Sequence, residues 1–274
     1  MNEQAFLTLG NVYTESKSTS SKYVALRRFK AFFGVTPRIC SLTWDKIKQS
    51  VPSGGAPKHL LWSLCFLKQY SVEHNRRSIF HADEKTICKW TWIFVELLSE
   101  LDVIDWEDRF EGAANGQTCF VTIDGVDFKI NEPTPFSAGW YSHKFRAAGL
   151  RYEISLNIRT GFIVWVFGGY PCGLYPDLKL AREAFVPSLK NGERAMADKG
   201  YKDAKRFILP NITNTKEHAL YMSRHETVNR RIKQFQILKQ VYRHSIQKHP
   251  MIVHAVANLT QLMLKNGHPL FCVI

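Results

Sequence analysis

The hydrophobic pattern of this 274-residue chain changes its period near residue 118, and this change limits the folds open to it. From 21 to about 105, apolar residues recur every three or four positions, as in amphipathic helices. From TCFVTIDGVDFKI (118–130) onwards the chain is rich in β-branched and aromatic residues with a period of two, which predicts strands. The polar segment 107–117 separates these parts. We therefore expect a helical region followed by a region built around a sheet.

The N-terminal part is expected to be all-helical. Residues 1–20 are polar and predict a mobile lead-in, and 21–112 predict a helical domain. Within this domain a helix begins near Glu84, after a short turn in which Asp83 provides the N-cap. Two interpretations stay open: a helix-turn-helix whose second helix contacts DNA, or a helical scaffold that uses the same pattern for packing.

The second part predicts an α/β fold with a mixed sheet flanked by helices. After the first strand, the expected elements are a hairpin (152–170), a helix (177–189), a strand that includes Asp198 (193–201), a loop (207–222) and two helices (225–247 and 251–265).

The charge of the chain is concentrated in its second part. The net charge is +13, and residues 118–274 contribute +11 of it, with 22 basic and 11 acidic residues. A basic region of this size indicates a polyanionic partner, of which nucleic acid is the usual one. The alternative is a soluble protein with an excess of lysine.

Several classes of protein are disfavoured by the sequence. The apolar runs are far shorter than the ~20 residues that a membrane span needs. The first twenty residues lack the basic start and apolar middle of a secretory signal. The six cysteines form no CxxC pair, which argues against a zinc ribbon and a disulfide framework.

Three acidic residues stand out by position. Asp124 and Asp198 are each expected at the end of an apolar strand, and Glu226 begins the predicted helix 225–247. A carboxylate at a buried strand end is costly unless it is paired, protonated or bound to metal, and ligands bind at such strand ends in open α/β sheets. Taken alone, Glu226 is better explained as a surface residue that pairs with Arg230, four residues on.

Three motifs occur in a characteristic order: TIDG on the first strand, ADKGY on a later strand, and Glu226 followed seven residues on by Lys233. Together with GLRYEISLNIRTGFIVWVFGGYP and SRHETVNRRIKQFQIL, they resemble the catalytic core of DDE transposases. The resemblance is closer to the Harbinger-type DDE superfamily endonucleases, which share features with bacterial IS-type transposases, and it runs from about residue 118 to the end. One departure concerns the arginine that the bacterial signature has four positions before the glutamate. Met222 stands at that position here, and Arg224 lies only two positions before Glu226.

This resemblance implies an RNase H-like fold in which Asp124, Asp198 and Glu226 form a catalytic triad. It also implies that the three carboxylates bind two divalent metal ions, Mg²⁺ or Mn²⁺ in its place. Such ions prefer oxygen ligands and support phosphodiester cleavage by activating the attacking oxygen and stabilising the leaving one. The implied enzyme is a DDE-type endonuclease and transposase, which hydrolyses and transesterifies DNA phosphodiesters.

Further residues are expected to support this site. Asp177 matches an acidic position of the family, and it is either a supporting residue beside the triad or the N-cap of the helix 178–189. The basic residues that flank the triad are expected to hold DNA phosphates without reading bases. They are Lys199, Lys202, Lys205, Arg224, Arg230, Arg231 and Lys233.

The expected function is that of a metal-dependent DNA endonuclease and strand transferase. The alternative is a domesticated, transposase-derived DNA-binding protein without catalysis. Double-stranded DNA is the expected partner and a membrane is not, while a second copy of the chain or an accessory DNA-binding protein stays open. A protein of this kind is expected in the nucleus if it is eukaryotic, and otherwise in the cytoplasm on DNA.

Overall fold

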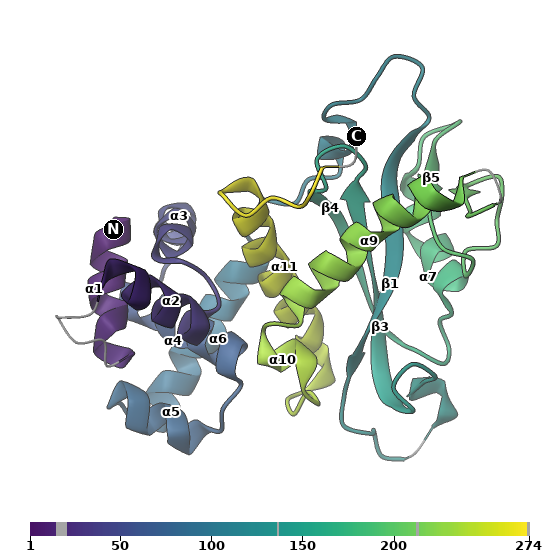
Figure 1. Cartoon of the computed structure of the whole chain (residues 1–274). Coiled ribbons are helices and arrows are strands. Elements are labelled where there is room, and N and C mark those ends of the chain that lie inside the picture. Colours follow the sequence, from purple (N-terminus) through teal and green to yellow (C-terminus); the bar gives the residue numbers. More distant parts are fainter. Residues whose placement is uncertain (15–20, 136, 212–213, 273–274) are drawn as a thin grey trace. The chain divides into compact units, whose positions relative to one another are not determined.

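A computed structural model describes residues 1–14, 21–135, 137–211 and 214–272 (Figure 1). The chain divides into two compact units, and each is assembled from separate stretches of sequence. The helical unit comprises Met1–Asp102, Ile232–Lys239 and Met251–Asn266. The sheet unit comprises Val103–Arg231, Gln240–Pro250 and Gly267–Ile274. The two C-terminal helical stretches therefore belong with the N-terminal helices rather than with the sheet.

The helices of the helical unit are α1 (Glu3–Tyr13), α2 (Lys22–Phe33), α3 (Pro37–Ile47), α4 (Pro57–Gln69), α5 (Glu73–Phe80), α6 (Glu84–Ser99), α10 (Gln236–Lys239) and most of α11 (His249–Lys265). Asn258 of α11 donates hydrogen bonds to the carbonyl oxygens of Leu98 and Ser99, at 3.0 and 3.1 Å. These bonds attach α11 to the end of α6. Within the described residues, none of the helices is both long and apolar enough to cross a membrane.

Helix α1 corrects the prediction of a mobile lead-in for residues 3–13; residues 15–20 of that lead-in lie outside the described residues. The side chain of Asn2 caps α1, and Phe6 and Leu7 are buried. Gly10 lets α1 approach α2 closely, because a Cβ atom there would lie 2.2 Å from the ring of Phe29. The few apolar residues of this polar segment thus lie on one side and are enough to hold a helix.

The predicted N-cap Asp83 is confirmed, and the neighbouring helices have similarly well-defined ends. Gly34 ends α2 in the left-handed conformation with φ of 83°, and the side chains of Thr36 and Asp83 cap α3 and α6. Helix α5, a short turn and α6 follow one another in the order of a helix-turn-helix. Lys85 and Thr86 are exposed in the first turn of α6, so both interpretations of this region stay open.

The sheet unit confirms the predicted RNase H-like α/β architecture. Its strands in the described residues are β1 (Cys119–Lys129), β2 (Tyr141–Ser142), β3 (Ala147–Asn157), β4 (Ile163–Pro171), β5 (Arg194–Met196) and β6 (Phe207–Ile208). Strand β3 pairs antiparallel with β1, β2 and β4, whereas β5 pairs parallel with β1 and β6. The sheet is therefore mixed, with β1 between its antiparallel and parallel parts.

Helices lie on both faces of this sheet. Residues such as Val121 and Ile123 of β1 share a core with α7 (Asp177–Glu183) and α8 (Phe185–Ser188). Alternate residues of β1, including Thr122 and Asp124, face α9 (Thr215–Ile232), as their hydrogen bonds show. Because side chains alternate across a strand, Asp124 and its neighbour Gly125 point to opposite faces.

Helix α9 departs from the predictions. It begins at Thr215, inside the expected loop 207–222, and it ends at Ile232, well before the expected end at 247. The side chains that it buries before Val228 include the polar residues His218, Arg224 and His225, so its sheet-facing stripe is not apolar. A search for hydrophobic periodicity therefore finds neither the start nor the direction of this helix.

Candidate active site

Asp124 lies in the middle of β1, rather than at its end as predicted, but just beyond the part of β1 that pairs with β5. Its side chain is half-buried. The pKa of its carboxyl is raised to about 6, mainly by burial and then by the negative charges of Asp198 and Asp177, while Lys144 acts in the opposite direction. A half-buried carboxyl with two acidic neighbours is a position that a cation would stabilise.

Asp198 lies beside Asp124 because of the register of the parallel strands. The last pair between β1 and β5 joins Thr122 to Met196, so each aspartate follows this pair by two residues. Asp198 is exposed, and its Oδ1 accepts a hydrogen bond from the backbone N–H of Gly200 at 2.8 Å. The structure thus brings the first two predicted catalytic residues together.

Asp177 is the third carboxylate of this group. Its Oδ1 lies 3.3 Å from the guanidinium Nη1 of Arg151, yet burial still raises the pKa of its carboxyl. A Cβ atom on Gly125 would lie 2.4 Å from Oδ1 of Asp177, and one on Gly200 would lie 3.3 Å from its Oδ2. The glycines that follow Asp124 and Asp198 therefore leave room for Asp177.

The N-cap interpretation of Asp177 is wrong. Pro176 is the N-cap of α7, and the helix has no side-chain cap hydrogen bond. Asp177 instead starts the helix with its carboxylate turned towards the other two aspartates, as a supporting residue would be.

Glu226 is not part of this group. It is exposed on α9, and among the described residues no hydrogen bond or ion pair joins it to an aspartate or to Arg230. Asn229, three residues later, lies about 60° round the helix axis and contacts the site instead. Its Nδ2 donates to Oδ2 of Asp124 at 3.3 Å. In the described residues no three His, Cys, Asp or Glu side chains form a ready-made metal site.

A buried pair lies behind the aspartates. Glu153 of β3 pairs with Gly125 across the strands and is fully buried. The Tyr201 hydroxyl donates to its Oε1 at 3.2 Å, and burial raises the pKa of the Glu153 carboxyl to about 8. This carboxyl is therefore mostly neutral at pH 7, and it joins β3 to the segment that follows Asp198.

A second polar network fixes Arg151. Its Nε donates to Oδ1 of Asp127 at 2.8 Å, and Ser142 donates to the other oxygen of Asp127 at 2.7 Å. The pKa of Asp127 is held below its ordinary value by these bonds, although burial acts against them. Arg151 thus has a fixed anion on one side and Asp177 on the other.

The seven predicted DNA-binding residues differ in exposure and in the unit to which they belong. Lys199, Lys202, Lys205 and Arg230 are exposed, as residues that contact phosphates must be. Lys233 belongs to the helical unit.

Arg224 is not available to DNA in this way, which corrects the prediction for it, whereas Arg231 is only partly shielded. Arg224 is buried and donates to the carbonyl oxygens of Ile158 and Phe271, at 2.9 Å for Ile158. Arg231 is half-buried and donates to the carbonyl oxygens of His268 and Pro269. Both guanidinium groups hold backbone segments together.

Three residues near the site were not found from the sequence. Lys144 comes from a turn with no recognisable motif, Glu153 stands inside an apolar strand, and Asn229 carries no charge. Of these three residues, only Glu153 could have been identified from the sequence, because a glutamate within a run of buried strand residues needs a polar partner.

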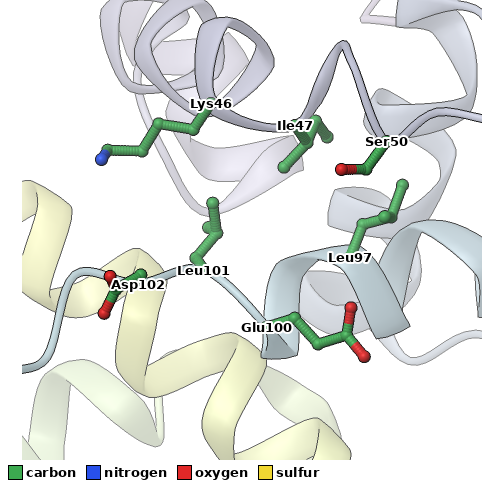
Figure 2. Close-up of a pocket in the computed structure, with 7 residues that line it drawn as sticks. All are labelled: Lys46, Ile47, Ser50, Leu97, Glu100, Leu101 and Asp102. Atoms are coloured by element: carbon green, nitrogen blue, oxygen red, sulfur yellow. The ribbon is translucent and has the colours of Figure 1, made fainter.

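One cavity of the helical unit is lined by residues far in the sequence from the aspartates. It has a volume of about 260 Å³ between the ends of α3 and α6 (Figure 2). Its lining residues are Lys46, Ile47, Ser50, Leu97, Glu100, Leu101 and Asp102. None of the predicted site residues lines it, so the aspartates of the sheet unit are the better candidate for chemistry.

Comparison with known proteins supports this choice. The family model described as DDE superfamily endonuclease matches residues 123–261, which include every aspartate of the group and all of α9. No curated protein and no solved structure gave a match.

Proposed function

Because the chain belongs to the DDE superfamily endonucleases, we propose that it cleaves phosphodiester bonds of double-stranded DNA with divalent cations. The observation that carries this proposal is the placement of Asp124 and Asp198 by the register of β1 and β5, with the negative charge of Asp177 acting on Asp124. The family as a whole is one of transposase-type nucleases that use divalent metals, which supports a metal-binding role for these carboxylates.

The donor set fits a hard divalent cation. All the groups are carboxylate oxygens, which Mg²⁺ and Mn²⁺ accept, and burial together with the charges of the other two aspartates raises the pKa of Asp124. Asp124 and Asp198 would hold the cation, with Asp177 turned to the same place by Arg151. When bound, such cations activate the attacking oxygen and relieve charge on the phosphate.

Glu226 stays in the proposal as the third catalytic carboxylate. It lies on α9, about one turn before the residue that contacts Asp124. A glutamate side chain has two rotatable bonds before its carboxyl and is unrestrained here by hydrogen bonds among the described residues. We propose that it turns towards the aspartates when a cation is bound.

The DNA backbone would follow the exposed lysines. Lys199, Lys202 and Lys205 are exposed and follow Asp198 directly in the chain. Ammonium groups hold phosphates without reading base edges, which suits an enzyme that positions any duplex for cleavage. Strand transfer, residence in the nucleus of a eukaryotic cell, and assembly with a second copy or an accessory DNA-binding protein belong to the same proposal.

A second candidate is a domesticated DNA-binding protein that no longer cleaves. One observation favours it: Glu226 is exposed and apart from the aspartates. This candidate keeps the exposed lysines and the affinity for DNA, and it differs from the first only in lacking cation-dependent cleavage.

Cleavage assays separate the two candidates. Wild type, Asp124→Asn, Glu226→Gln and the control Glu183→Gln, an exposed residue of α7, are incubated with supercoiled plasmid and with labelled duplexes carrying the ends of the parent element. We expect nicking with Mg²⁺ or Mn²⁺ by wild type and the control, and a loss of several orders of magnitude in both site variants. A wild-type protein that binds DNA but never nicks it with either metal would establish the second candidate.

A further inference from the structure

Two polar residues of α9 meet two polar residues of β1. His225 and Asn229 are one turn apart on the helix, and Thr122 and Asp124 are two residues apart on one face of the strand. The Nε2 of His225 lies 2.7 Å from Oγ1 of Thr122, and Nδ2 of Asn229 lies 3.3 Å from Oδ2 of Asp124. Asn229 is thus a residue of α9 that donates a hydrogen bond directly to the Asp124 carboxylate.

The other end of the Asn229 amide is not satisfied within the protein. Its Oδ1 is shielded from solvent and has no hydrogen-bond partner among the described residues. A shielded carbonyl oxygen without a partner lowers stability, whereas an apolar side chain of the same shape would avoid this cost. A polar residue here therefore has to be explained by what its nitrogen does for Asp124.

The charges around Asp124 give that explanation. Asp198 and Asp177 both repel its carboxylate. A third acidic neighbour at 229 would add to the repulsion, and an apolar one would leave Oδ2 of Asp124 without its donor. An amide offers an N–H to the carboxylate without adding charge.

We propose that Asn229 is a positioning residue that holds Asp124 in the orientation in which it shares a divalent cation with Asp198. This inference rests on the proposed function, because it requires that the aspartates bind a cation. It adds a neutral residue of α9 to a site otherwise described by its carboxylates.

Binding of Mn²⁺ alone to the full chain, followed by titration calorimetry, tests the inference without reference to cleavage. The variants are Asn229→Leu, which keeps the shape and removes the donor, and Asn191→Leu, a matched control at an exposed turn. We expect Asn229→Leu to weaken Mn²⁺ binding at least about tenfold, the size of one hydrogen bond to a charged group, and Asn191→Leu to leave it unchanged.

A double-mutant cycle in metal-free protein provides a second readout. It compares unfolding of wild type, Asn229→Leu, Asp124→Leu and the double variant. If Asn229 holds Asp124, the two substitutions are coupled by about tenfold in the unfolding equilibrium constant. Additive effects would overturn the inference. Should Asn229→Leu not fold, Asn229→Asp replaces it, with a lower melting temperature in metal-free buffer and a larger rise on adding Mn²⁺ than wild type.

The outcomes separate the role of Asn229 from the proposed function. If Asn229→Leu binds Mn²⁺ as tightly as wild type does, the role of Asn229 is overturned and the proposed function is unaffected. Wild type that binds no Mn²⁺ would overturn the cation-dependent function, and the inference with it. Coupling in the cycle together with weakened Mn²⁺ binding supports both.

Discussion

At the scale of single residues, the site depends on the missing side chain of Gly125 as well as on its carboxylates. Gly125 leaves the space that Oδ1 of Asp177 occupies, because a Cβ atom there would lie 2.4 Å from that oxygen. Asp177 cannot simply move away, since it is held by Arg151 at 3.3 Å. The glycine of the TIDG motif is therefore needed for its size rather than for an unusual backbone conformation.

We expect Gly125→Ala to displace Asp177 and to lower the free energy of unfolding by about 1–3 kcal/mol, the usual cost of overpacking. Mn²⁺ binding should weaken as well. Chemical denaturation and calorimetry measure the two effects. Combining Gly125→Ala with Asp177→Ala removes the clash, so the double variant should regain part of the lost stability. If the double variant loses as much unfolding free energy as Gly125→Ala alone, the destabilisation does not come from a clash with Asp177.

Glu153 makes the stability of the protein depend on pH. Its carboxyl has a pKa of about 8 in the folded protein, above its ordinary 4.5, so ionisation is disfavoured in the folded state. The stability that the neutral carboxyl contributes is complete below pH 4.5 and is lost as the pH rises through 8. Over this interval the loss is up to about 1.4 kcal/mol per pH unit.

The variant Glu153→Gln keeps the shape of the side chain and cannot ionise. We therefore expect its free energy of unfolding to exceed that of wild type increasingly between about pH 5 and pH 8. Urea denaturation at several pH values measures the difference, with the exposed Glu183→Gln as the control. A difference between Glu153→Gln and wild type that does not change with pH would mean that Glu153 is ionised in the folded protein.

At the scale of elements, two of the three arginines of α9 differ in their surroundings. Arg224 is buried and donates to backbone carbonyl oxygens, including that of Phe271 at 3.0 Å, whereas Arg230 is exposed. We expect Arg224→Met to lower the free energy of unfolding by about 2–4 kcal/mol, because it leaves buried carbonyls without donors. DNA affinity of the folded variant should stay as in wild type.

Arg230→Met is the matched comparison on the same helix. It should leave the free energy of unfolding within about 0.5 kcal/mol of wild type, as exposed substitutions usually do, and should weaken DNA binding. Thermal denaturation and fluorescence anisotropy of a labelled duplex measure both variants. The assignment of roles would be reversed if Arg224→Met bound DNA less tightly while its stability was unchanged.

Strands β1, β3, β4 and β5 could be predicted from the sequence, whereas the two-residue strands β2 and β6 and helix α9 could not, and β6 lies inside the predicted loop 207–222. The segment 118–130 alternates clearly and becomes β1, and the turn at 159–161 joins β3 to β4. Asp124 and Asp198 were found because carboxylates are rare among apolar strand residues. In α9 the buried stripe is partly polar, so its periodicity is hidden, and the contact of Asn229 with Asp124 depends on how the helix lies on the sheet.

At the scale of the whole molecule, the division of the chain follows contacts that the sequence does not display. Asn258 bonds to Leu98 across 160 positions, and Lys68 donates to the carbonyl of Gln234 at 2.8 Å. Such contacts place α10 and most of α11 in the helical unit. The change of hydrophobic period near 118 marks where the sheet begins, but it carries no information about helices that return to an earlier core.

The distribution of charge over the whole chain leads to the last prediction. Residues 118–274 carry a net charge of +11, and Lys199, Lys202 and Lys205 are exposed directly after Asp198. If these lysines contact phosphates, each releases counterions from DNA, and the logarithm of the binding constant falls by about 0.9 per decade of salt for each contact. Replacing all three by glutamine should therefore make the salt dependence shallower by about 2–3, equally for duplexes of unrelated sequence.

Anisotropy titrations of labelled duplexes over a range of KCl concentrations measure this slope, and the control replaces three exposed residues of α2, Lys22, Arg27 and Arg28. Equal slopes for wild type and the lysine variant would exclude these lysines from the DNA path. A shallower slope in the α2 control alone would assign the phosphate contacts to the helical unit, because counterion release reports only those cations that meet the backbone.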